Sequence, residues 1–162
     1  MPGNANNTEL DLPPGLEPEV ARAAFNDARA WGTPNREEGS VGYDRGMGIE
    51  SVQMNSVAVG EIPFKVAVDG KGKVPGLRYF NHTHGWSTTW SDMYFSRDDT
   101  ENVAGRFGAP VFLRNGRGEF RVFIPGMETG TKIATGQDRG RKLRYGQAEG
   151  HVLCRECFPP NK

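Results

Sequence analysis

The chain of 162 residues lacks a long hydrophobic run, and it lacks an excess of charge of either sign. No apolar stretch approaches the roughly 18 residues that a membrane span needs, and no N-terminal pattern marks a signal peptide. The 20 basic residues balance the 20 acidic ones, so the charge balance does not indicate a nucleic-acid partner. We therefore expect no membrane partner. A secreted role would require a route without a signal peptide, or a larger parent chain.

Cysteine is scarce as well, with only Cys154 and Cys157, which form C-R-E-C near the end of the chain. This spacing fits half of a metal site, a redox pair or two plain thiols in a solvated tail. His151 lies three residues upstream and adds a ligand type that zinc accepts. The sequence leaves a second metal site or a redox role open for these three residues.

Glycine and proline are abundant, at 22 and 11 residues, which favours short strands and turns over long helices. Apolar residues at i and i+4 predict a helix that begins near Pro18 and ends at Gly32. A second helix is predicted at about 97–107, between the N-cap Ser96 and the C-terminal Gly108. Strands are predicted at 39–45, 50–59, 63–68, 75–81, 109–114, 119–124 and about 131–135.

This order of elements predicts a single α+β domain, an α/β sandwich built around one mixed sheet with flanking helices. We expect a flexible N-terminal segment at 1–16 and a metal-dependent hydrolase domain at 17–135. A basic, glycine-rich tail with the CxxC motif is expected at 136–162.

The sharpest functional signal is the segment N-H-T-H-G, which contains His82 and His84. Residues i and i+2 of a strand point to the same face, so the two imidazoles can bind one metal ion. Catalytic zinc usually takes three protein ligands and keeps a position for water. The acidic start of the second helix supplies the third ligand, for which Asp99 is our choice and Asp98 the alternative.

A hydrolase also needs a general base, and the candidates are Glu37, Glu38, Glu50 and Glu61. Glu37 and Glu38 are favoured because they lie where the first helix gives way to the first strand. The aromatic residues Trp86 and Trp90 follow the histidine pair, and they are candidates for a substrate wall or for packing over the sheet.

A glutamate before the first strand, then H-x-H, then S-x-x-D at a helix start resembles the motif of the JAB/JAMM metalloproteases. The segments R-E-E-G, H-T-H-G and F-S-R-D-D, with the hairpin at 109–126, resemble more closely the JAB-like domain of RHS-type and other bacterial polymorphic toxins. This likeness covers about residues 18–135. Gly85 stands where the eukaryotic enzymes have proline, and the loop 85–95 is longer than theirs.

The resemblance implies a zinc-dependent hydrolase that cleaves a peptide or isopeptide bond. It implies one zinc ion held by His82, His84 and Asp99, with Glu37 as the base and Ser96 as a donor to the oxyanion. It further implies an effector delivered by a secretion system such as type VI in bacterial competition, with an immunity protein as partner. Without such delivery the expected location is the cytoplasm.

Two alternatives remain at this stage. The basic residues near the end of the chain would suit a metal-dependent nuclease toxin; they are Arg139, Arg141, Lys142 and Arg144. A catalytically inactive JAB-like interaction module is the other alternative.

Overall fold

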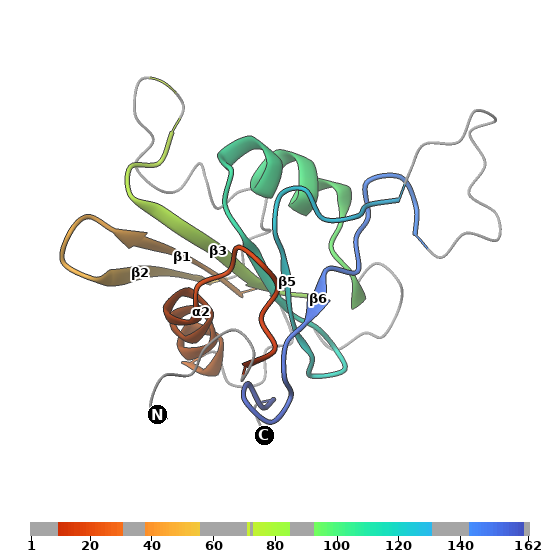
Figure 1. Cartoon of the computed structure of the whole chain (residues 1–162), viewed down its shortest axis with the longest axis horizontal. Helices are drawn as coiled ribbons and strands as arrows, with labels where there is room; N and C mark the ends of the chain where they lie inside the picture. The colour runs from red at the N-terminus through yellow and green to blue at the C-terminus, as the bar shows by residue number, and fades with distance from the viewer. Residues whose placement is uncertain are drawn as a thin grey trace.

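A mixed six-stranded sheet forms the centre of the molecule in the computed structural model (Figure 1). The structure describes residues 10–30, 38–55, 71, 73–84, 93–130 and 143–160. The strands lie in the order β2-β1-β3-β4-β5-β6, and all neighbours are antiparallel except β3 and β4. Their bounds are Glu38–Asp44 for β1, Ile49–Asn55 for β2, Leu77–Thr83 for β3, Val111–Arg114 for β4, Phe120–Phe123 for β5 and His151–Val152 for β6.

One helix covers each face of this sheet. The helix α2 (Pro18–Ala30) packs through Val20, Ala24 and Ala28 onto the face that carries Tyr79 and other aromatic side chains. The helix η2 (Asp98–Gly105) packs through Val103 and Ala104 onto the other face. The expected single α+β domain with a mixed sheet and flanking helices is therefore confirmed.

The helix η2 lies within the predicted second helix, and it is a π-helix along its whole length. The N–H group of Arg106 reaches the carbonyl oxygen of Glu101, five residues earlier, as in a π-helix. Gly108 ends the helix in the left-handed conformation, with a φ angle of 66°, as the sequence predicts.

Both ends of the described chain belong to the core, which corrects the expected division at residues 16 and 136. Leu10, Leu12 and Leu16 are buried beside α2, so the expected flexible segment 1–16 is wrong for residues 10–16. In the expected tail, β6 extends the sheet, and Leu153 and Phe158 are buried. Apolar burial explains both results, because these side chains close the core on the face covered by α2.

Some predictions concern residues that the structure does not describe. They are the strands at 63–68 and about 131–135, the end of the strand at 50–59, and most of the turn between residues 69 and 73. Within the described ranges, no helix has the length and apolar character needed to cross a membrane.

Candidate metal centre

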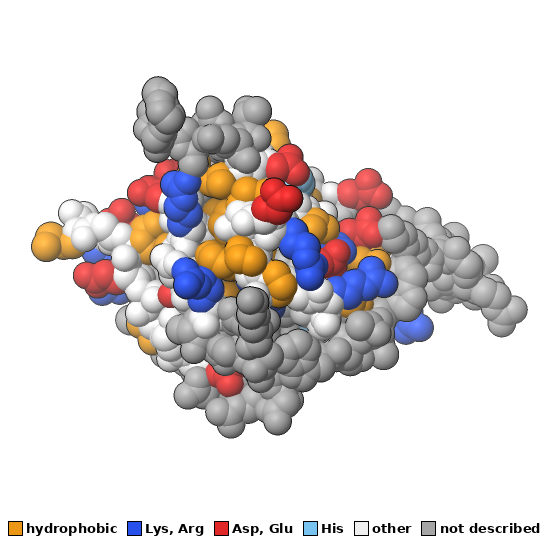
Figure 2. Space-filling view, turned by 90° about the horizontal axis from the view of Figure 1, so that it is seen from below, with side chains coloured by type: hydrophobic (Ala, Val, Ile, Leu, Met, Phe, Trp, Pro, Cys, Tyr) orange, Lys and Arg blue, Asp and Glu red, His pale blue; other side chains and the backbone are white. Residues whose placement is uncertain are grey.

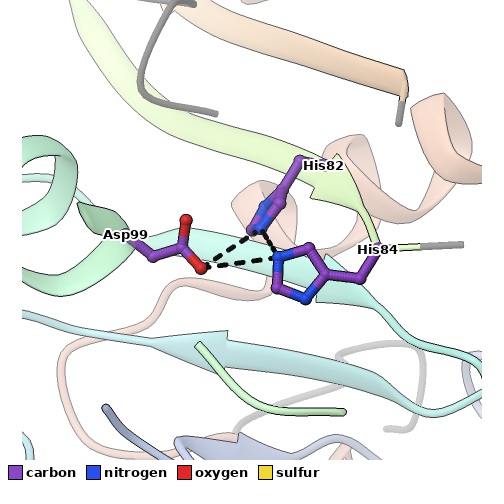
Figure 3. Close-up of side chains that lie close together, drawn as sticks. All are labelled: His82, His84 and Asp99. Carbon is purple, nitrogen blue, oxygen red and sulfur yellow. Dashed lines mark hydrogen bonds and ion pairs between the residues drawn. The ribbon is translucent and has the colours of Figure 1, made fainter. Parts of the chain in front are cut away.

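The two histidines of the N-H-T-H-G segment meet at the C-terminal end of β3, as the strand alternation predicts. His82 is fully buried on the sheet face covered by η2, and His84 follows directly after the strand. The Nε2 atoms of the two rings lie 2.9 Å apart (Figure 3). Both rings therefore present the same nitrogen to one point.

The helix η2 brings Asp99 to that same point. Its Oδ2 atom lies 3.4 Å from Nε2 of His82 and 3.6 Å from Nε2 of His84. Asp99 is completely buried, and its Oδ1 atom accepts no hydrogen bond within the described part of the chain. A buried carboxylate is costly unless a cation or hydrogen bonds compensate its charge, so this environment suits a metal ligand.

A reciprocal capping box holds Asp99 in place at the start of the helix. The Ser96 N–H donates to Oδ2 of Asp99 at 2.8 Å, and the Asp99 N–H donates to Oγ of Ser96 at 3.1 Å. Each side chain thereby satisfies a backbone donor that the helix itself cannot satisfy. These two hydrogen bonds are those expected of the predicted cap Ser96, although the π-helix itself begins one residue after Arg97, and the same serine lies beside the ligand group.

The electrostatics of the site keep Asp99 charged. Burial raises the pKa of its carboxyl group, but His82, His84 and the Ser96 N–H lower it by more, so the net shift is downward. An ionised carboxylate is the form that binds a metal ion.

The backbone fixes which nitrogen of His82 is available. Its Nδ1 atom lies 2.8 Å from the carbonyl oxygen of Phe112 on β4. Because a carbonyl oxygen only accepts, Nδ1 must carry the proton, and Nε2 of the neutral ring keeps its lone pair. This arrangement is typical of metal-binding histidines, whose other ring nitrogen donates to a carbonyl or carboxylate group.

The spacing of the three atoms can be compared with a tetrahedral zinc site. Ligand atoms at 2.0–2.2 Å from zinc and at tetrahedral angles lie about 3.3–3.6 Å apart. The two separations that involve Asp99 match this range, and the separation of the two histidines is shorter by about 0.5 Å. A small outward movement of one ring would complete the fit. The group can hold a metal ion, and its donor atoms suit zinc.

Of the candidate bases, Glu38 and Glu50 are described. Glu38 and Ser40 lie on the same face of β1, and the Ser40 hydroxyl donates to Asp27 of α2 on that face. Gly39, between them, pairs with His82 and so shares the opposite face with it. Glu38 is thus directed to the sheet face opposite the histidine pair. Glu50 is exposed and pairs with Tyr43, at the far end of β1 from this pair. Glu37, Glu61, Trp86 and Trp90 lie outside the described residues.

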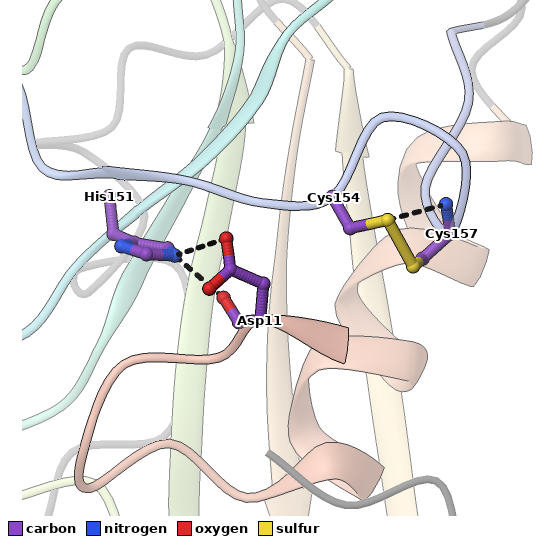
Figure 4. The surroundings of a disulfide bond; sticks show 4 residues. All are labelled: Asp11, His151, Cys154 and Cys157. Atoms are coloured by element: carbon purple, nitrogen blue, oxygen red, sulfur yellow. Dashed lines mark hydrogen bonds and ion pairs between the residues drawn. A yellow bond between two sulfur atoms is a disulfide. The ribbon is translucent and has the colours of Figure 1, made fainter. Parts of the chain in front are cut away.

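The second candidate site does not assemble as a metal site. Cys154 and Cys157 form a disulfide bond, and Nε2 of His151 lies 2.6 Å from the carbonyl oxygen of Asp11 instead (Figure 4). Within the described residues, the group suited to a metal ion consists of His82, His84 and Asp99. Of the three interpretations of C-R-E-C, the structure matches a redox pair, in its oxidised disulfide form.

A buried polar group on the β4–β5 hairpin contacts the segment that leads to Asp99, and the sequence did not predict it. Asn115, Glu119 and Arg121 are connected by hydrogen bonds and contact the chain just before Ser96. Their signal in the sequence is weak: the alternation of β5 puts residues 119 and 121 on one face, but it does not show which segment they contact.

The face seen in Figure 2 shows positive and negative side chains interspersed among apolar ones. Of the four basic residues that would suit a nuclease, Arg144 alone is described. The described surface on this face shows no extended area of positive charge.

No protein-family model matches the chain, and no curated protein or solved structure shows significant similarity to it.

Proposed function

We propose that this chain is a zinc-dependent hydrolase that cleaves a peptide or isopeptide bond. The observation that supports the proposal most strongly is the convergence of three ligand atoms within 3.6 Å of one another, from β3, the residue that follows it, and η2. Three protein ligands with room for water are typical of catalytic rather than structural zinc sites. The order of glutamate, H-x-H and S-x-x-D, which resembles the JAB/JAMM motif, supports the choice of reaction.

In this proposal His82, His84 and Asp99 hold the ion. Bound there, zinc would supply a Lewis acid for the substrate carbonyl and acidify a water molecule. Glu37 would act as the base, which takes a proton from the attacking water and gives it to the leaving amine. The hydroxyl of Ser96 accepts the Asp99 N–H, so its own proton is available to the developing oxyanion.

The choice of Glu37 rests on the position of its neighbour. Because Glu38 is directed to the α2 face of the sheet, it is poorly placed to exchange protons at the histidine pair. Glu37 and Glu38 are adjacent and chemically identical, so they form a matched pair of sites for substitution.

The first test measures the metal. Purified protein is expected to contain about one zinc ion per chain by mass spectrometry, the stoichiometry of a single three-ligand site. The double variant His82→Ala, His84→Ala should lose it. Unchanged zinc in that variant would contradict the site.

The second test measures the reaction with a panel of fluorogenic peptides and isopeptides. Glu37→Gln should keep its zinc and lose hydrolysis, whereas Glu38→Gln should keep both. Chelation should abolish the activity, and added zinc should restore it. Degradation of plasmid DNA or RNA by the same preparation would favour the nuclease, and zinc binding without any hydrolysis would favour an interaction module.

The toxin-type resemblance extends the proposal to a biological setting. We propose an effector domain of a larger secreted parent chain, with a cognate immunity protein as its partner. Expression in the bacterial cytoplasm should slow growth, and the His82→Ala, His84→Ala variant should not. Equal growth with the two proteins would contradict this setting.

A further inference from the structure

The ligand Asp99 depends on the placement of the chain that precedes it. His82 lies on β3 and His84 directly follows it, but Asp99 comes from a helix start that must be brought to them. The described segment just before this helix start, residues 93–95, has a short strand bridge at Phe95. Whatever fixes this segment therefore also fixes the third ligand.

Side chains of the β4–β5 hairpin hold this segment through polar contacts. The Nδ2 group of Asn115 donates to the carbonyl oxygen of Met93 at 3.0 Å and to Oε1 of Glu119 at 2.9 Å. The guanidinium group of Arg121 lies over the ring of Tyr94, 5.1 Å from its centroid. Met93 and Tyr94, two consecutive residues shortly before Asp99, are thus contacted by one buried polar group.

Arg121 connects the hairpin to two other segments of the chain. Its Nη2 and Nε atoms donate to Oε1 of Glu119 at 2.8 and 3.1 Å, and its Nη1 donates to the carbonyl oxygen of Glu149 at 2.9 Å. The neighbouring Ala148 forms the backbone bridge with Phe95, with hydrogen bonds of 2.9 and 3.1 Å. One guanidinium group therefore joins the hairpin, the segment before Ser96 and the C-terminal chain.

The charges of this group favour a fixed geometry. Arg121 is 6% exposed and Asn115 3% exposed. Burial raises the pKa of Glu119, but the hydrogen bonds from Asn115 and Arg121 lower it by more, so the carboxylate stays ionised. A partly buried bond between two charged groups is stronger than one between neutral groups, and the planar guanidinium limits the orientations of its partners.

We propose that Arg121 is a positioning residue for the metal ligand Asp99, acting through Tyr94, Glu119 and Glu149. This inference rests on the metal site of the proposed function, but not on the bond that the site cleaves. Arg121 pairs with Leu113, which in turn pairs with His82, so it lies two strands from the histidine, about 10 Å away. It therefore acts on the metal site through the chain that it holds, without touching the ion.

The structure offers a matched control in Arg114, on β4. Like Arg121 it is almost fully buried, it donates to backbone carbonyl groups of the C-terminal chain, and it lies against aromatic rings. Its side chain donates to the carbonyl groups of Gly118, Phe158 and Pro159 and lies on the sheet face opposite the metal site. Its backbone carbonyl group accepts the N–H of His84, a contact that a side-chain substitution leaves in place. Replacing either arginine removes a buried guanidinium, but only one of them contacts the segment before Asp99.

The experiment compares Arg121→Met with Arg114→Met in the full chain. Zinc affinity is measured by competition with a chromophoric chelator, and the absorption spectrum of bound Co²⁺ reports the coordination geometry. We expect Arg121→Met to lose zinc affinity by about 10–100-fold, the usual effect of removing support behind a metal ligand. The Co²⁺ bands should also weaken or shift. Arg114→Met should keep the wild-type affinity within about threefold.

A second variant, Glu119→Gln, keeps the side-chain shape and removes the charge that orients Arg121. It should show the same spectral change with a smaller loss of affinity, and it provides the answer if Arg121→Met fails to fold. Wild-type affinity in Arg121→Met or Glu119→Gln, or equal losses in the Arg114 and Arg121 variants, would overturn the inference. A wild-type chain that binds no zinc would overturn the proposed function itself, which separates the two results.

Discussion

The Nδ1 atom of His82 donates its proton to the carbonyl oxygen of Phe112, at a distance of 2.8 Å. This hydrogen bond joins β3 to β4 through a side chain, and it leaves Nε2 directed at His84 and Asp99. His151 shows the opposite arrangement, because its Nε2 atom faces the carbonyl oxygen of Asp11 at 2.6 Å. The two rings are therefore expected to be different tautomers when neutral.

The first prediction follows from this difference. In zinc-free protein at about pH 8, well above the ordinary histidine pKa, neutral His82 should carry its proton on Nδ1 and His151 on Nε2. Long-range proton–nitrogen NMR spectra distinguish the two forms. Added zinc should shift Nε2 of His82 and leave His151 unchanged. A proton on Nε2 of neutral His82 would contradict the geometry that we describe.

The second prediction concerns Ser96, which caps the helix that carries Asp99. Ser96→Ala should lower the free energy of unfolding by about 1 kcal/mol, the usual effect of a lost N-cap, as measured in urea. If the hydroxyl also donates to the oxyanion, kcat should fall by about 10²–10³-fold with zinc retained. Ser96→Thr keeps the hydroxyl and should lose much less activity. A stable, fully active alanine variant would exclude both roles.

The third prediction concerns the buried carboxylate of Asp27, which lies between α2 and the sheet. It accepts hydrogen bonds from Ser40 and Ser51 at 2.9 Å each and from the hydroxyl group of Tyr79. Burial, followed by the contact with Asp27, raises the pKa of Tyr79 far above its ordinary value near 10. The folded chain therefore keeps this proton where the unfolded chain has lost it.

Because the pKa is raised on folding, this contribution to stability is complete below pH 10 and falls as the pH rises beyond it. Tyr79 should make the free energy of unfolding fall by about 1.4 kcal/mol per pH unit above pH 10. Tyr79→Phe should remove that part of the slope and lower stability at pH 7 by about 1–3 kcal/mol, because Asp27 loses a donor. Identical slopes for the two proteins in urea unfolding between pH 9 and 11 would refute the assignment.

The fourth prediction concerns the disulfide between Cys154 and Cys157. Without reductant, iodoacetamide should label neither cysteine in the unfolded chain. Reduction should cost about 2 kcal/mol of unfolding free energy, since the bond closes a loop of only four residues. The double variant Cys154→Ser, Cys157→Ser should still bind about one zinc ion per chain, because neither cysteine belongs to the metal centre. Loss of that ion would show that the cysteines contribute ligands.

Features encoded over a few residues could be predicted from the sequence. The helix at Pro18, the capping pair Ser96 and Asp99, and the left-handed Gly108 all depend on neighbours within one or two turns. The shared face of His82 and His84 follows from strand alternation alone. The pairing of β3 with the hairpin, which brings the carbonyl group of Phe112 to His82, has no local signal.

Features that depend on distant segments could not be predicted. Leu12 and Leu16 stand among prolines and polar residues, and only the docking of this segment against α2 makes them core. The sheet face to which Glu38 is directed could be known only from the register of β1 against β3. The C-R-E-C spacing suits a metal site and a disulfide equally well. Only the structure shows that the two cysteines bond to each other and that His151 contacts Asp11 instead.

The parallel pairing of β3 and β4 has a consequence for how the molecule gains its metal. Parallel neighbours require a crossover, and η2 lies within this one, so all three ligands come from a single contiguous stretch of eighteen residues, 82–99. An ion bound there would tie the end of β3 to the start of η2 and leave the leucines of the N-terminal segment untouched. Metal binding should thus stabilise β3 and η2 more than the rest of the molecule. Chelation should accelerate hydrogen exchange in β3 and η2 before it affects α2.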